Sequence, residues 1–252
     1  MLDTLKLSSV RAAAQRIASH VVRTPTIRRT QSGRELLLKP EGLQPIGAFK
    51  LRGAINKMIQ LDPSCPGVVA HSSGNHAQAV ARAAKILGIP AVIVMPNNAP
   101  PLKRMRTEAD DAEVIIVGPD SDERKRRAAE IAVERGLVPV EPYDDPDIAA
   151  GQGTAALELI EDCGKLDRFY APVSGGGLMA GCAVVVAALC PDAEIIAVEP
   201  ETKDALRRSL KAGERICVDP PTTIADGLRV RVPGALTWPV LQRHVHRVEL
   251  VR

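Results

Sequence analysis

From residue 67 onward, short apolar runs alternate with amphipathic stretches, and this alternation constrains the fold more than any other feature of the chain. The runs 67–71 and 91–95 are almost entirely apolar, as in strands that are buried on both faces. The amphipathic stretches after them have helical periodicity and stop at Gly88 and Gly136, a residue type common at helix C-termini. Strands that alternate with helices predict an α/β fold in which helices flank parallel sheets.

The same reading extends to the rest of the chain. It predicts further strands at 113–117, 137–140, 169–173 and 194–198, and helices at 76–87, 101–110, 121–135 and 178–190. The proline-rich stretch 141–147 is interpreted as a crossover between two lobes.

Composition excludes several classes of function. A net charge of +3 and 2% aromatic residues argue against nucleic-acid partners and against binding to an anionic membrane. No apolar run is long enough to cross a bilayer, and the N-terminus lacks the apolar core of a signal peptide. Five cysteines without C-x-x-C spacing argue against a disulfide framework and a zinc site. We expect reduced thiols in a cytoplasmic protein.

Two glycine-containing turns lie between a predicted strand and a predicted helix, at 72–75 (SSGN) and 174–177 (SGGG). Ligands of open α/β sheets bind at the carboxyl ends of strands. Three successive glycines allow close approach of the backbone, and the N–H groups of the following helix suit a phosphate. Spacing alone leaves a purely structural tight turn equally acceptable.

The second turn also fits a dinucleotide-binding template. Gly175, Gly177 and Ala180 match G-x-G-x-x-A, and Glu199 ends the next predicted strand, where a ribose-binding acid would lie. On this alternative the chain is an NAD-dependent oxidoreductase.

Lys50 has an unusual context for a lysine, which is ordinarily a surface charge. It follows Phe49, between Gly47 and Gly53, where a loop enters a predicted helix. A nucleophilic amine must be held near neutrality by desolvation or by nearby positive charge. The sequence therefore marks Lys50 as a candidate nucleophile.

The segment 47–54 (GAFKLRGA) resembles the Schiff-base lysine motif of the pyridoxal-phosphate (PLP) dependent serine/threonine dehydratase and serine racemase family, which has the tryptophan synthase β-like fold. The segment 72–78 resembles its substrate-carboxylate loop, and 174–178 its phosphate loop, with Ser174 where many members have glycine. The motifs AGQGT (150–154) and IADG (224–227) recur in order. The resemblance implies a large domain (residues 1–66 and 144–252) and a small domain (residues 67–143).

The resemblance also implies a role for each residue of the site. Lys50 holds PLP and removes the substrate α-proton, Phe49 packs on the ring, Gly227 lines it, and Asn75 bonds the ring hydroxyl. The phosphate ligands are Ser174, Gly175, Gly176, Gly177 and Leu178, and the substrate carboxylate is held by Ser72, Ser73, Asn75 and His76. Structural alternatives are helix caps for Ser73 and Asn75, a turn-closing role for His76, a structural loop role for Gln152 and a turn role for Asp226.

Within the family, two reactions are candidates. In the racemases the residue at Ser73 is an acid/base on the opposite face, and a divalent-metal site follows the strand that ends in A-x-E-P. Glu199 keeps the first carboxylate of that site, but Ala205 stands at the second, with Asp204 one place away. Because a hard cation needs several oxygen ligands, we expect no metal. Tyr143 stands where dehydratase-like members often have an aromatic residue.

We therefore predict an ammonia-lyase (dehydratase) that converts L-threonine, L-serine or both into a 2-oxo acid and ammonia, with 3-hydroxyaspartate open as a substrate. Serine racemase is the alternative, and a homodimer is implied. Family members continue with a segment that carries a Ser or Cys facing the pyridine nitrogen, whereas this chain ends at Arg252. The C-terminal part is therefore expected to be missing, and a non-catalytic PLP-binding remnant is a further alternative.

Overall fold

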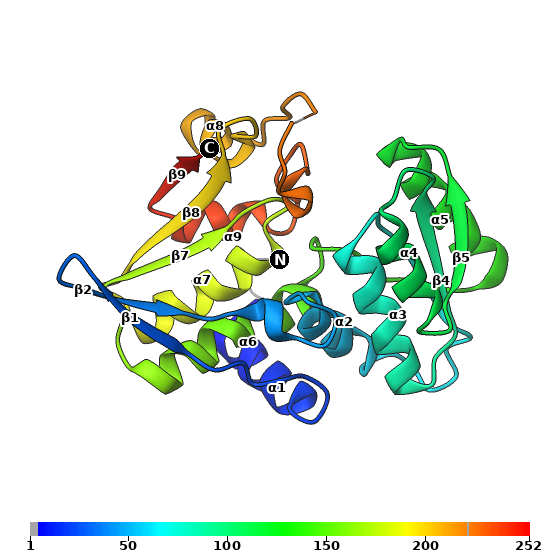
Figure 1. Ribbon diagram of the computed structural model, residues 1–252, viewed down its shortest axis with the longest axis horizontal. Helices are drawn as coiled ribbons and strands as arrows, with labels where there is room; N and C mark the ends of the chain where they lie inside the picture. The colour runs from blue at the N-terminus through cyan, green and yellow to red at the C-terminus, as the bar shows by residue number, and fades with distance from the viewer. Residues whose placement is uncertain (1–4, 221) are drawn as a thin grey trace. The chain divides into compact units, whose positions relative to one another are not determined.

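The computed structural model describes residues 5–220 and 222–252, which form two compact units (Figure 1). The first unit comprises Met1–Gln15, Arg23–Pro40 and Tyr143–Arg252, and the second comprises Arg16–Val22 and Glu41–Pro142. The division after Pro142 lies close to the boundary expected at 143–144. The segments 16–22 and 41–66, however, belong to the second unit rather than to the first. The functional domain boundaries therefore stay a prediction.

The second unit contains a four-stranded parallel sheet of order β5-β4-β3-β6. Helices α3 and α4 lie on one side of this sheet and α5 on the other (Figure 1). The elements in chain order are η1 (Glu41–Leu43), α2 (Lys50–Met58), β3 (Val68–His71), α3 (Asn75–Leu87), β4 (Ala91–Pro96), α4 (Pro101–Glu108), β5 (Glu113–Val117), α5 (Ser121–Arg135) and β6 (Val138–Pro139). The parallel sheet predicted from the apolar runs is confirmed.

Local sequence explains where these helices begin and end. Gly88 and Gly136 stop α3 and α5 in the left-handed conformation, with φ of 67° and 66°, which glycine adopts without steric cost. Asp120 caps α5, because its carboxylate accepts hydrogen bonds from the N–H groups of Asp122 and Glu123.

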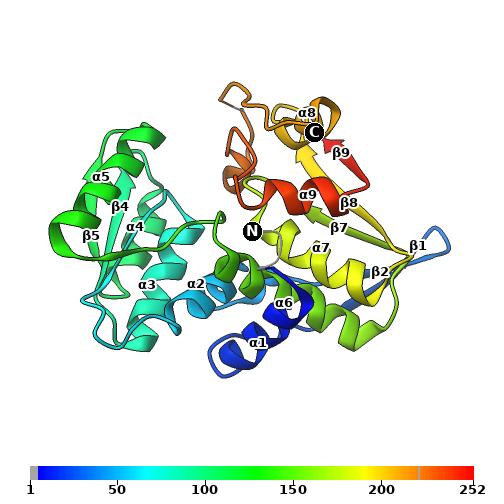
Figure 2. The ribbon, with the colours of Figure 1, turned by 180° about the vertical axis from the view of Figure 1, so that it is seen from behind.

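The first unit contains a parallel sheet of order β7-β8-β9 and an antiparallel hairpin, β1-β2. Helices α6, α7 and α9 lie beside the parallel sheet (Figure 2). The elements are β1 (Ile27–Gln31), β2 (Arg34–Leu38), α6 (Pro146–Cys163), β7 (Arg168–Pro172), α7 (Gly177–Leu189), β8 (Glu194–Pro200), α8 (Ala205–Ala212), η2 (Asp226–Leu228), α9 (Trp238–His244) and β9 (Arg247–Val251); α1 (Leu7–Ile17) continues into the second unit.

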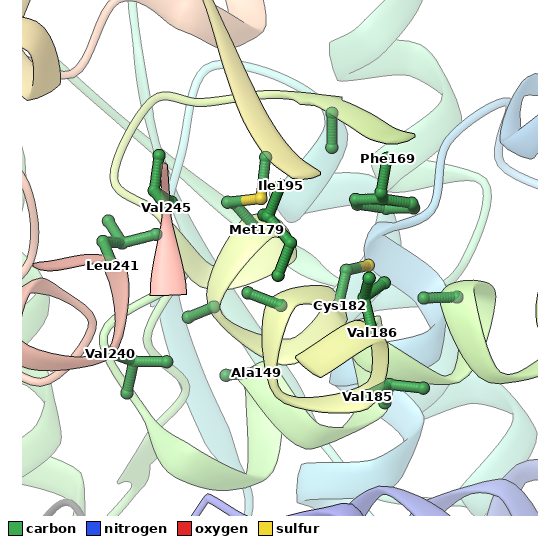
Figure 3. Packing of buried hydrophobic residues seen from close by; sticks show 14 of the residues in the cluster. Ala149, Phe169, Met179, Cys182, Val185, Val186, Ile195, Val240, Leu241 and Val245 are labelled. Carbon is green, nitrogen blue, oxygen red and sulfur yellow. The ribbon is translucent and has the colours of Figure 1, made fainter. Parts of the chain in front are cut away.

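The core of the first unit lies between α7, its sheet and the neighbouring helices. Met179 and Val186 of α7 pack with Ile195 of β8 and Leu241 of α9, and all four are buried (Figure 3). Helix α7 is apolar along most of its length because it is enclosed by other elements.

Helices α6 and α7 approach so closely that only glycine fits at their crossing. A Cβ at Gly153 would lie 2.6 Å from the Gly181 carbonyl oxygen, and one at Gly181 would lie 2.0 Å from that of Ala149. The AGQGT motif is therefore part of α6, and the loop role considered for Gln152 is wrong, because Gln152 lies buried within this helix. Among residues 5–220 and 222–252, no helix has both the length and the apolar character needed to span a membrane.

Candidate active site

Lys50 is the first residue of α2, in the second unit. The loop before it turns at Gly47, whose φ of 73° lies in the left-handed region. Phe49 occupies the N-cap position. The start of a helix carries a partial positive charge, which disfavours a second positive charge on the Lys50 amine.

The loop that presents Lys50 is held by a buried ion pair that the sequence did not suggest. Arg52, fully buried on α2, binds both carboxylate oxygens of Glu41 through Nε (2.7 Å) and Nη2 (2.8 Å). Gln44, also buried, donates to the carbonyl of Val22 and accepts from its N–H. This bidentate geometry fixes the chain on both sides of the turn at Gly47.

The Lys50 amine lies in a desolvated environment. Its Nζ donates a hydrogen bond to the carbonyl oxygen of Pro142 and lies 5.4 Å from the centroid of the Phe49 ring. Desolvation disfavours the ammonium form and lowers the pKa of Lys50 to about 8. Such an amine is a competent nucleophile near neutral pH, as the sequence predicted.

We expect the rate at which PLP attaches to Lys50 to rise with pH and to level off above about pH 8, because the neutral amine is the reactive form. With a pKa of about 8, about a quarter of the molecules carry the neutral amine at pH 7.5, against about one in a thousand for an ordinary lysine. Stopped-flow absorbance at a series of pH values measures this rate, with N-acetyl-lysine as the control. A rate that still climbs steeply between pH 9 and pH 10 would contradict the assignment.

The turn Ser72–His76 follows β3 in the same unit. The Ser72 hydroxyl accepts a hydrogen bond from the N–H of Gly74 (3.1 Å). Gly74, rather than a polar side chain, is the N-cap of α3, and no side chain caps this helix. The helix-cap alternative for Ser73 and Asn75 is therefore wrong. Ser73 is exposed and Asn75 is half-buried, so both side chains are left for another role.

His76 is 3% exposed, and its Nε2 lies 2.9 Å from the carbonyl oxygen of Val140. Since a carbonyl can only accept, Nε2 carries the proton. Desolvation, together with the charge of Lys50, lowers the pKa of His76 to about 3, so the ring is neutral. The ring thus joins α3 to the end of β6, in keeping with the structural alternative, and its N–H in the first turn of α3 remains for a ligand.

The glycine-rich turn belongs to the first unit and connects β7 to α7. Its carbonyl groups bond to the protein: that of Gly175 accepts from the N–H of Gly234 (3.0 Å) and from Thr237 Oγ1 (2.7 Å). The first N–H bonded inside α7 is that of Ala180, to the carbonyl of Gly176 (2.8 Å). The N–H groups of the preceding first turn therefore have no acceptor within the helix. This geometry, with carbonyls bonded inward and helix amides available, suits a phosphate.

Each glycine of this turn is required by its surroundings. A Cβ at Gly175 would lie 2.3 Å from the Tyr143 ring, and one at Gly177 would lie 2.9 Å from the Tyr143 carbonyl oxygen. Gly176 has φ 102°, and a Cβ there would lie 2.8 Å from Thr237 Oγ1. Sequence reasoning missed that Tyr143 packs on this turn.

Two further predicted residues lie in the first unit. The Ser174 hydroxyl accepts a hydrogen bond from the N–H of Val230 (3.1 Å), which fixes the start of the turn. Gly227 is exposed within η2, next to Asp226. The turn role considered for Asp226 agrees with its place at the start of this short helix.

Glu199 is not the ribose-binding acid that the dinucleotide template requires. It is fully buried, and its Oε1 lies 2.6 Å from Lys203 Nζ. Oε1 also accepts from the N–H of Leu206, and Oε2 from that of Arg207 (both 3.0 Å). Because both oxygens are engaged inside the first unit, Glu199 presents none to a ribose.

Together, the residues fit PLP chemically. A desolvated lysine suits the cofactor's aldehyde, and the first-turn amides of α7 suit its phosphate. Lys50 and the turn Ser72–His76 lie in the second unit, whereas the residues Ser174–Leu178 and Gly227 lie in the first. The fold and these two sets of residues define the class: an α/β enzyme with a nucleophilic lysine and an anion-binding turn.

Comparison with known proteins gives the family. The model for "pyridoxal-phosphate dependent enzyme" matches residues 17–252, so the chain belongs to the PLP-dependent enzyme family. L-threo-3-hydroxyaspartate ammonia-lyase of Saccharomyces cerevisiae is 39% identical over 239 residues, which cover 92% of this chain and 73% of that protein.

Two solved structures agree. A threonine deaminase from the organism abbreviated T.th. is 42% identical, with a TM-score of 0.92 over 98% of this chain and 82% of that one. Maize serine racemase is 40% identical, with a TM-score of 0.95 over 98% of this chain and 77% of that one. The predicted family, the α/β fold and the PLP cofactor are confirmed.

Proposed function

We propose that the chain is an ammonia-lyase that converts a 3-hydroxy amino acid into a 2-oxo acid and ammonia. L-threonine, L-serine and L-threo-3-hydroxyaspartate are the candidate substrates. The observation that carries the proposal is the Lys50 amine, whose pKa of about 8 lets it act as a nucleophile and as a base near neutral pH. Relatives named threonine deaminase and L-threo-3-hydroxyaspartate ammonia-lyase support this substrate class.

PLP, when bound, supplies an electron sink for the negative charge that develops at the substrate α-carbon. We assign to Lys50 two tasks: it holds the cofactor covalently, and once the substrate amine has displaced it, its Nζ accepts the α-proton. Desolvation of Nζ serves both tasks, because each requires the neutral amine.

Binding is divided among the remaining predicted residues. The first-turn amides of α7 and the Ser174 hydroxyl hold the phosphate, and Phe49 packs against the ring. Gly227 lines the ring and Asn75 bonds its hydroxyl. The substrate carboxylate is held by Ser72, Ser73, Asn75 and His76, the last through its backbone N–H, because its ring already bonds Val140.

Serine racemase is the second candidate activity, and the exposed Ser73 hydroxyl favours it. Racemisation needs an acid/base on each face of the α-carbon, and Ser73 is proposed to be the partner of Lys50. In a Ser73→Ala variant, racemisation is then lost while release of 2-oxo acid continues.

One experiment separates these functions. The protein, loaded with PLP, is incubated with each of the three amino acids; release of 2-oxo acid reports elimination, and chiral chromatography of the remaining serine reports racemisation. Borohydride reduction followed by peptide mass spectrometry identifies the labelled lysine. Failure to take up PLP, or a label on another lysine, contradicts the proposal. Uptake at Lys50 without turnover supports a non-catalytic PLP-binding protein instead.

We further propose a homodimeric, cytoplasmic protein. None of the five cysteines, all within the described residues, is in a disulfide, in keeping with reduced thiols. Size-exclusion chromatography with light scattering measures the oligomeric state, and a monomer at micromolar concentration contradicts this part of the proposal.

A further inference from the structure

A buried ion pair joins Lys203 to Glu199 in the first unit. Both side chains are 0% exposed, and Nζ lies 2.6 Å from Oε1. Glu199 lies on β8, and Lys203 lies between β8 and α8. Removing two charges from water is costly, and apolar residues of similar volume often stabilise a fold as well. The function described above gives this pair no task.

Glu199 performs the work of a helix cap. Its two oxygens accept from the N–H groups of Leu206 and Arg207, in the first turn of α8. Asp204, the N-cap residue itself, makes no such bond and instead pairs with Arg207 and Arg208. The buried carboxylate is therefore stabilised by the N-terminus of α8 as well as by the Lys203 ammonium.

Lys203 reaches the strand that leads into the glycine-rich turn. Its Nζ lies 3.4 Å from the Ser174 carbonyl oxygen and 3.5 Å from that of Val173. An ammonium has three N–H donors, and Glu199, Val173 and Ser174 provide three acceptors. The Ser174 hydroxyl is fixed separately by the N–H of Val230.

The atoms around this ammonium are of the kind that binds a hard metal ion. One carboxylate oxygen and two carbonyl oxygens surround Nζ, and such oxygens are typical ligands of Mg²⁺ and Ca²⁺. The resemblance to the racemases placed the first carboxylate of a divalent-metal site at Glu199. With Nζ in contact with this carboxylate, the residues do not fit a metal ion there, and no cluster of three or more His, Cys, Asp or Glu suited to a metal occurs in the described part of the chain.

We propose that Lys203 is a positioning residue whose ammonium acts as a built-in cation, in place of a divalent metal ion, and holds the phosphate-binding turn in its binding geometry. The Lys203 Nζ fixes the carbonyls of Val173 and Ser174, so that the amides after them point toward the phosphate. This inference rests on the proposed phosphate role of residues 174–178.

The test uses PLP and pyridoxal, which lacks the phosphate, as paired ligands. In the double variant Glu199→Gln/Lys203→Met both charges are removed, so no buried charge is left unpaired and the protein folds. Its dissociation constant for PLP is expected to rise about tenfold, an amount equal to 1.4 kcal/mol, whereas that for pyridoxal stays unchanged. An unchanged PLP constant, or an equal loss for both ligands, overturns the inference.

The single variant Lys203→Met leaves Glu199 without its cation. It is expected to melt about 10 °C below the parent protein, whereas Lys211→Met, an exposed lysine of α8, melts as the parent does. A melting temperature of Lys203→Met equal to that of the parent overturns the role of the ammonium.

Metal binding provides an independent readout that does not need PLP. The parent protein is expected to melt at the same temperature in EDTA, Mg²⁺ or Mn²⁺, and to bind no Mn²⁺ by electron paramagnetic resonance. One Mn²⁺ per chain that is lost in Glu199→Gln overturns the inference. Failure of the parent protein to take up PLP refutes the proposed function instead, and the metal and melting measurements remain valid.

Discussion

Replacement of Lys50 by alanine is expected to abolish covalent uptake of PLP and to lower 2-oxo acid release by at least about 10³-fold, because one amine both holds the cofactor and removes the α-proton. The amine is prepared for both tasks by desolvation at the start of α2, which lowers the pKa of Lys50 to about 8. Absorbance spectroscopy measures the first effect, and a coupled assay of 2-oxo acid measures the second.

Two controls make this result specific to the Lys50 amine. Lys125→Ala removes an exposed lysine of α5 and is expected to keep full activity. Added ethylamine is expected to restore part of the activity of Lys50→Ala, because a free amine can accept the α-proton. Full activity of Lys50→Ala without added amine would exclude Lys50 as the base and the cofactor anchor.

Replacement of Gly175 by alanine is expected to weaken PLP binding about 100-fold, which corresponds to roughly 3 kcal/mol. The new Cβ would lie 2.3 Å from the Tyr143 ring, so the turn must move away from the position that its carbonyl bonds to Gly234 and Thr237 define. A displaced turn no longer directs its amides at the phosphate. Fluorescence titration with PLP measures the change.

The double variant Gly175→Ala/Tyr143→Ala tests whether contact with the ring is the cause. Removing the ring creates room for the Cβ, so PLP affinity is expected to recover by at least about tenfold relative to Gly175→Ala. Gly42→Ala is the matched control, because a Cβ there has no neighbour within 4 Å and needs no left-handed backbone. If Gly175→Ala binds PLP as tightly as the parent protein does, the turn does not carry the phosphate.

Periodicity located the regular elements well wherever burial decides them. The apolar runs at 91–95 and 113–117 became β4 and β5, and the amphipathic stretch 121–135 became α5. The hairpin β1-β2 was not predicted, because its strands are largely exposed and show no apolar pattern. Helix α6 was missed because its glycines, which look like a loop, serve the crossing with α7.

The two histidine and glutamate predictions show a different limit. His76 and Glu199 were assigned from their places in motifs, yet their side chains bond Val140 and Lys203 within their own units. A motif gives the type of residue at a position but not the direction of its side chain. That direction depends on which backbone groups other segments bring near.

The sequence by itself determined the α/β class, the family and the choice of Lys50, since hydrophobic alternation and motif spacing are properties of the chain read in order. Only the tertiary structure decided that desolvation tunes the Lys50 amine, that Tyr143 makes glycine necessary at 175, and that Lys203 occupies the cation position at Glu199. The physical reason is that desolvation, steric exclusion and buried-charge pairing depend on distances between segments far apart in the chain.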